Sequence, residues 1–196
     1  NSDNLDIRVI AMIVKQIADL RVRGLDILLV TSGAIAVGGQ LIGHRSVNHS
    51  ISYRQVLAAI GQSRLMHVYE ELFSKHDITV AQALLSRSNI TDREGYLNVR
   101  NTLISLLDLG VVPIINENDV VAVEEIGVEV FGDNDRLSAM VANLIDADLL
   151  IMLSDIDGLH TSDPHENPDA KLIQYVGKID DSIEAMAGDH HSDRSR

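Results

Sequence analysis

Three short polar segments have the residue types and spacing needed for ligand chemistry. Residues 31–34 (Thr-Ser-Gly-Ala) are small, and residues 116–119 (Asn-Glu-Asn-Asp) combine amides with carboxylates. Residues 132–135 (Gly-Asp-Asn-Asp) include two aspartates. Small residues let backbone N–H groups approach an anion, whereas a carboxylate pairs with an ammonium group and an amide with a carboxylate. Carboxylates at a helix start can also hold Mg²⁺ or orient a lysine.

Each of these segments also has a purely structural interpretation. Residues 31–34 suit a tight turn before a helix, and residues 116–119 suit a turn closed by asparagine or aspartate side chains. One acid of residues 132–135 is needed to cap the helix that follows. We favour function for residues 116–119, because four consecutive polar residues exceed what a turn requires, and the other acids of residues 132–135 are surplus to capping.

Hydrophobic periodicity predicts the elements that hold these segments. Helical spacing of apolar residues predicts five helices, whereas short apolar runs predict buried strands. The predicted helices are residues 5–23, 53–75, 95–109, 135–145 and 180–187, and the predicted strands are residues 26–31, 78–82, 111–115 and 149–153. Residues 124–131 alternate in polarity and suit a hairpin or edge strand, and residues 154–169 are expected to form a loop.

Apolar strands separated by helices predict an α/β fold, a three-layer sandwich in which helices cover both faces of a mostly parallel central sheet. Ligands bind such sheets at the carboxyl ends of the strands. Residues 31–34 and 116–119 each come at the end of a predicted strand, where such a fold is expected to bind a ligand. The loop that starts at Ser154 and Asp155 follows another strand and could line a nucleotide pocket, although its Asp-Gly and Asp-Pro pairs are those of ordinary turns.

Composition excludes several other classes of protein. The 196 residues carry a formal net charge of −13, which is opposite to the basic surface that nucleic-acid binding requires. The absence of cysteine excludes disulfides and thiolate catalysis. No apolar run approaches the roughly 18 residues of a membrane span. The eight histidines lack the spacing of zinc ligands, the sequence has no P-loop motif, and we assign no metal-ligating residue.

Six segments, in this order, resemble the amino acid kinase family and, within it, the glutamate kinases. They are VTSGAIAVG (30–38), LAAIGQSRLM (57–66), residues 92–94 with the run 97–102, VVPIINENDVV (111–121), FGDNDRLSAMVA (131–142) and LSDIDGLHTSDPHENPDAKLI (153–173). The resemblance extends from about residue 5 to about residue 188. It implies the amino acid kinase fold and ATP-dependent phosphorylation of the γ-carboxylate of L-glutamate, the first step of proline biosynthesis, with Mg²⁺.

The resemblance also implies roles for individual residues. It places Ser32, Gly33, Asp119 and Asn134 on glutamate. It places Ser154 and Asp155 at the nucleotide. It gives Asp135 a catalytic role as the organiser of catalytic lysines. A cytoplasmic homo-oligomer, dimer or tetramer, that is inhibited by proline and binds neither nucleic acid nor membrane is the expected context.

The sequence departs from the family pattern at both ends. The initial strand with its lysine and the later lysine-bearing nucleotide loop have no match in residues 1–196, and we expect no PUA-type domain there. We therefore expect residues 1–196 to form a single amino acid kinase domain that is incomplete at both ends. The alternatives are a non-catalytic relative or fragment that binds glutamate or proline, and a kinase of the same fold for another small acid. A free ammonium group needs the Asp119 carboxylate, whereas an acetylated amine does not.

Overall fold

The computed structural model describes residues 5–43, 51–121, 134–154 and 156–187. This part of the chain divides into two compact units, one within residues 1–150 and one within residues 151–196. In the first unit, three parallel strands form a sheet in the order β1-β3-β2. The strands are β1 (Leu29–Val30), β2 (Val80–Leu85) and β3 (Val112–Glu117). All six residues of the central strand β3 are buried.

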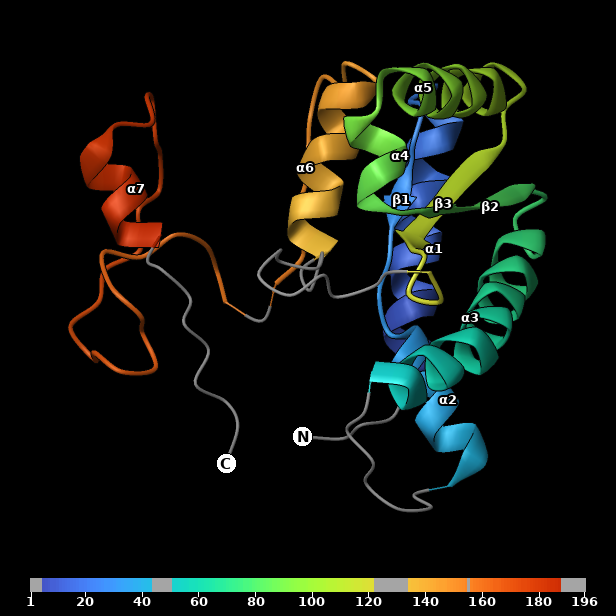
Figure 1. Ribbon diagram of the computed structural model, residues 1–196. Helices are drawn as coiled ribbons and strands as arrows, with labels where there is room; N and C mark the ends of the chain where they lie inside the picture. Colours follow the sequence, from blue (N-terminus) through green and yellow to red (C-terminus); the bar gives the residue numbers. More distant parts are fainter. Residues whose placement is uncertain (1–4, 44–50, 122–133, 155, 188–196) are drawn as a thin grey trace. The chain divides into compact units, whose positions relative to one another are not determined.

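The described part of this unit also contains six helices (Figure 1). Each predicted helix that falls in the first unit is present, with its ends shifted by a few residues, and α2 and α4 had no predicted bounds. The helices are α1 (Ile7–Val22), α2 (Ala34–Ile42), α3 (Ile51–Ser74), α4 (Arg87–Thr91), α5 (Arg93–Asp108) and α6 (Asn134–Leu144).

Local chemistry explains where the first long helix begins and ends. The carboxylate of Asp6 accepts a hydrogen bond from the backbone N–H of Arg8 at 2.9 Å and so caps the start of α1. Beyond its last turn, Gly24 adopts a positive φ of 81°, a conformation that glycine reaches without steric cost. The helix therefore ends within one residue of the predicted bound at residue 23.

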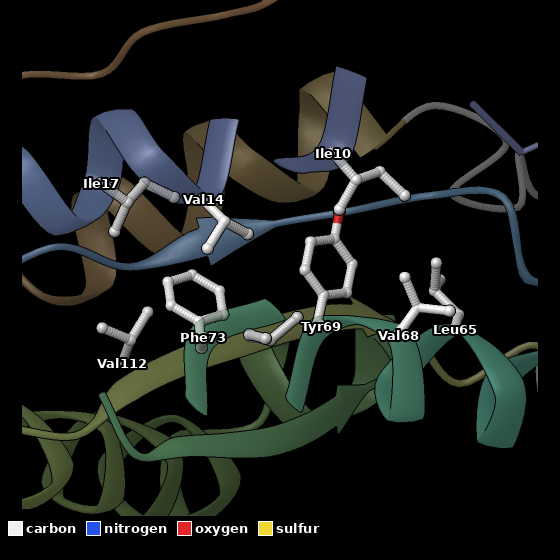
Figure 2. Packing of buried hydrophobic residues seen from close by; sticks show 9 residues of the cluster. Ile10, Val14, Ile17, Leu65, Val68, Tyr69, Phe73 and Val112 are labelled. Carbon is white, nitrogen blue, oxygen red and sulfur yellow. The ribbon is translucent and has the colours of Figure 1, made fainter. Parts of the chain in front are cut away.

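Alternate residues of β3 face two separate hydrophobic clusters. Val112 and Ile114 pack among residues of α1 and α3, which include Val14 and Phe73 (Figure 2). Ile115 instead belongs to a cluster whose other members come from β2, α4, α5 and α6. Because successive side chains of a strand point to opposite faces, helices cover both faces of the sheet. The predicted α/β architecture, with helix layers on both sides of a parallel sheet, is confirmed.

Several predicted strand bounds were wrong. β1 contains only two residues, β2 begins later than predicted, and β3 extends through Asn116 and Glu117. Residues 149–153 form no strand in the described structure, and their exposed fractions range from 40% at Leu150 to 74% at Leu149. An apolar run shows a preference for burial, but a strand also needs a hydrogen-bonded neighbour, and no described strand pairs with this run. The predicted hairpin at residues 124–131 lies outside the described residues.

The second unit has little regular structure among its described residues. An isolated antiparallel bridge joins His160 to Leu172, and the predicted last helix is present as α7 (Asp181–Ala187). The carboxylate of Asp180 caps α7 by accepting hydrogen bonds from the backbone N–H groups of Ser182 and Ile183, both at 3.1 Å. Within the ranges described, no helix has the length and the apolar character that crossing a membrane requires.

Candidate functional site

The carboxyl ends of the three strands meet at one edge of the sheet. Val30 of β1 is in register with Ile115 of β3, and the backbone N–H of Thr31 donates to the Ile115 carbonyl at 2.9 Å. On the other side of β3, the N–H of Asn118 donates to the Leu85 carbonyl at 2.9 Å. The segments that follow β1 and β3 are therefore neighbours, as ligand binding at the end of a parallel sheet requires.

The chain turns sharply after β1 and enters α2. Thr31 is buried, and its hydroxyl shares a 2.9 Å hydrogen bond with the hydroxyl of Tyr69 in α3. Ser32 is exposed, and Gly33 has a φ of 102°, which favours glycine. Gly33 is the N-cap of α2 and provides no side-chain cap. The start of α2 thus presents backbone N–H groups and the positive end of a helix dipole, which favour an anion.

Two glycines bring α3 against this turn. A Cβ atom on Gly61 of α3 would overlap the carbonyl oxygen of Ala34, the first residue of α2. A Cβ atom on Gly38 of α2 would likewise overlap the carbonyl oxygen of Leu57 in α3. Close approach of the two backbones therefore requires glycine at both positions. This close approach places Gly61 and its neighbours in α3 near the turn between β1 and α2.

A buried pair of amide side chains joins α3 to β3. Asn116 Nδ2 donates to Gln62 Oε1 at 2.8 Å, and the backbone N–H of Glu117 donates to Asn116 Oδ1 at 2.9 Å. Gln62 is 8% exposed and Asn116 is 3% exposed. The second polar atom of Gln62, Nε2, is buried and bonds to no group of the described residues. Buried polar groups are normally satisfied, so this donor is available to a ligand atom or a water molecule.

Two carboxylates lie at the end of β3. Burial raises the pKa of Glu117 from its ordinary value of 4.5 to about 7, and the charge of Asp119 adds to the rise. Burial also raises the pKa of Asp119, while the positive charge of Arg54 on α3 opposes that rise. Shifted pKa values of grouped acids are typical of functional sites. A cationic ligand at this place would find two carboxylates in a partly desolvated environment.

Asn134 and Asp135 form the first turn of α6. The Oδ1 atom of Asn134 is buried and has no hydrogen-bond partner among the described residues, whereas Asp135 is exposed. In Figure 1 this turn lies toward the same end of the first unit as the carboxyl end of β3. The cluster that contains Ile115 also contains Leu137, one turn further along α6. The unpartnered amide oxygen suits a donor such as an ammonium group.

Ser154 belongs to the second unit, and Asp155 lies outside the described residues. The Ser154 side chain is exposed, and its hydroxyl accepts a 3.4 Å hydrogen bond from the backbone N–H of Ile156. The contact of Ser154 and Asp155 with a nucleotide stays a prediction.

Sequence reasoning did not single out Gln62 or Arg54, and it selected Glu117 only as part of the polar segment 116–119, without a role of its own. Gln62 had a detectable signal, because it occupies the same helical face as the buried Ala58, Leu65 and Tyr69. A polar residue on an otherwise apolar face needs a buried partner. No such local signal distinguishes Glu117, whose burial depends on the strands and helices around it. In the described residues, no three histidine or acidic side chains converge as metal ligands.

A family model and the curated relatives both relate this chain to the amino acid kinases. The model of the amino acid kinase family matches residues 2–192. Glutamate 5-kinase of Dehalococcoides mccartyi is 55% identical over 183 residues, which are 93% of this chain and 49% of that protein. Glutamate 5-kinase of Herpetosiphon aurantiacus is 51% identical over 174 residues, 89% of this chain and 46% of that protein. The chain thus spans about half the length of the curated relatives it matches.

A solved structure supports the same fold. Isopentenyl phosphate kinase of T. acidophilum, determined as a product complex, matches with a TM-score of 0.56 and 20% sequence identity. The match covers 88% of this chain and 71% of that one. At this identity the likeness concerns the fold alone, and it agrees with the helix-covered parallel sheet described above. Since the family model runs through nearly all of the sequence, the chain belongs to the amino acid kinase family.

Proposed function

We propose that this protein transfers the γ-phosphoryl group of ATP to the γ-carboxylate of L-glutamate, as the catalytic domain of a glutamate 5-kinase. The observation that carries the proposal is the 55% identity, over 93% of the chain, to a relative that bears this name. The same name belongs to relatives of other bacteria at 50–51% identity. The product, glutamyl 5-phosphate, is the first intermediate toward proline.

The chemistry of the strand ends suits an amino acid with a second carboxylate. Asp119 is assigned to the α-ammonium group, because a partly buried carboxylate binds a cation most strongly where water is scarce. Ser32 and Gly33 are assigned to a carboxylate, because the start of α2 offers uncapped backbone N–H groups. Asn134 contributes an amide whose buried oxygen has no partner among the described residues and whose N–H₂ group can serve a carboxylate.

In the proposed reaction, a γ-carboxylate oxygen of glutamate bonds to the γ-phosphorus of ATP. The bond from that phosphorus to the oxygen bridging the β- and γ-phosphates breaks, and ADP leaves. Catalysis of such a transfer consists mainly of positioning and of cations that offset the charge on the phosphoryl oxygens. We assign to Asp135, exposed at the start of α6, the orientation of catalytic lysines.

Ser154 and Asp155 are assigned to the nucleotide. Mg²⁺ is bound in kinases chiefly by the substrate phosphates, with one or two protein carboxylates, so the acidic start of α6 fits its oxygen preference. When bound, the ion would offset charge on the phosphates. Both units are proposed to belong to a single domain, because the family model runs through both. A homo-oligomeric state, inhibition by proline and a cytoplasmic location stay predictions.

The direct test is glutamate-dependent release of ADP by the purified protein, with hydroxylamine to trap the acyl phosphate. We expect turnover with L-glutamate and none with N-acetyl-L-glutamate or carbamate. Turnover with either of these compounds in place of L-glutamate would contradict the proposed substrate. Binding of L-glutamate without any ADP release would contradict the proposed catalysis and favour a non-catalytic binding protein.

A further inference from the structure

We propose that Gln62 contacts the substrate directly and that its Nε2 group donates a hydrogen bond to the α-carboxylate of the bound amino acid. This inference rests on the proposed function and extends it to a residue of α3. Three observations carry it: the fixed orientation of the Gln62 amide, its position beside the end of β3 and near the start of α2, and the carboxylate of Asp119 at the same strand end.

The hydrogen bonds around Asn116 fix the orientation of both amides. A backbone N–H can only donate, so the group that accepts from Glu117 must be the oxygen of Asn116. The nitrogen of Asn116 then points at Gln62, where only an oxygen can accept it at 2.8 Å. The remaining polar atom of Gln62 is therefore an N–H₂ group. It is a donor, it is buried, and it has no acceptor among the described residues.

Packing places Gln62 beside the end of β3 and near the start of α2. The Gln62 side chain meets Asn116 of β3, and the adjacent Gly61 lies against the Ala34 carbonyl at the start of α2. Gln62 therefore lies close to the turn at Ser32 and Gly33. With the uncapped start of α2, its N–H₂ group forms a set of donors that suits a carboxylate.

The surrounding charges select an amino acid over a nucleotide phosphate. Asp119 follows Asn116 at the same strand end, and a carboxylate there repels a polyanion. An amino acid carries an ammonium group on the same carbon as its α-carboxylate. The carboxylate can therefore meet Gln62 while the ammonium group meets Asp119. A donor and an acceptor at adjacent places match this pair of opposite charges.

The test is the affinity of L-glutamate, measured by isothermal titration calorimetry, for the wild-type protein, Q62E, Q62M and Q40E. In Q62E one carboxylate oxygen still accepts from Asn116, but the other presents a negative charge to the ligand. We expect Q62E to weaken binding about 100-fold, and Q62M, which only removes the donor, about 10-fold. Q40E makes the same chemical change at an exposed position of α2 and should bind within about twofold of wild type.

Two further measurements separate contact with the substrate from a structural role. The α-carboxamide analogue of L-glutamate lacks the α-carboxylate but keeps the γ-carboxylate. The loss of affinity from wild type to Q62E should be much smaller for this analogue than for L-glutamate. N116D keeps the acceptor for Glu117 N–H but removes the donor to Gln62, so the Gln62 amide should turn and present its oxygen. N116D should therefore also weaken L-glutamate binding, although Gln62 is unchanged.

The outcomes distinguish this inference from the proposed function. If wild type binds L-glutamate and Q62E and Q62M bind it as tightly as Q40E does, Gln62 is not a ligand contact and the function stands. If N116D binds as wild type does, the orientation argument is wrong. If wild type itself does not bind L-glutamate, the proposed function fails. Thermal unfolding without ligand verifies that each variant is folded. If Q62E does not fold, Q62M is the variant that tests the inference.

Discussion

Gly61 of α3 lies so close to Ala34 of α2 that a Cβ atom at position 61 would overlap the Ala34 carbonyl oxygen. Both residues are buried, and Ala34 directly follows Gly33, the N-cap of α2. The contact thus links helix packing to the turn that we assign to the substrate. Since a backbone carbonyl cannot rotate away as a side chain can, any larger residue must push the two helices apart.

The first prediction concerns this crossing. Gly61→Ala should lower the free energy of unfolding by about 3 kcal/mol and should raise the KM for glutamate, because α2 and α3 must separate. Gly39→Ala is the matched control, since a Cβ on Gly39 of α2 meets nothing within 4 Å. It should be neutral or stabilise the protein by up to about 1 kcal/mol. Thermal or urea unfolding measures both, and equal stabilities would contradict the packing described here.

The second prediction concerns Asp119. Asp119→Ala should raise the KM for glutamate by about 100-fold with a smaller change in kcat, because the ammonium group loses its charged partner. Asp108→Asn removes a carboxylate at the exposed end of α5, near the opposite end of β3, and should leave the KM unchanged. Steady-state kinetics with varied glutamate decide the matter. Unchanged glutamate kinetics in Asp119→Ala would remove this residue from the site.

The third prediction separates two roles of Asp135. If this exposed residue orients catalytic lysines, Asp135→Ala should lower kcat by about 100-fold and change the KM values less. If it only stabilises the start of α6, the variant should lose up to about 1 kcal/mol of stability and keep its kcat. Measuring kcat together with the unfolding free energy distinguishes the roles. A normal kcat in a destabilised variant would show that the residue serves the helix.

The fourth prediction follows from the raised pKa of Glu117. Between pH 4.5 and about 7, this carboxyl group holds its proton in the folded protein and loses it in the unfolded chain. The free energy of unfolding should therefore fall as the pH rises through this window, by on the order of 1 kcal/mol from this group. Glu117→Gln should flatten the profile across the same window. Urea unfolding at several pH values measures the slope.

Glu70→Gln is the control for this profile, because Glu70 is exposed on α3. It should leave the difference in stability between pH 5 and pH 8 as it is in wild type. A Glu117→Gln profile that is parallel to the wild-type profile would show that the carboxyl group is not buried as described.

Local sequence patterns were sufficient for most of the helices and for the central strand. α1, α3 and α5 were predicted because apolar residues recur with the helical period, and the core of β3 because its run is continuously apolar. The acidic and amide residues after this run could also be selected from sequence, since their number exceeds what a turn needs. These features depend on residues that are near one another in the chain.

The tertiary structure decided the strand order, the partners of the buried polar groups and the pKa of Glu117. Gln62 and Asn116 are 54 residues apart, and only the approach of α3 to β3 makes them a pair. Residues 149–153 have the composition of a buried strand but no strand partner in the described structure, so composition alone misled the prediction. The hydrophobic periodicity of a segment shows how strongly that segment prefers burial. Contacts between residues distant in sequence decide which other segment covers it and which polar groups are buried in the contact.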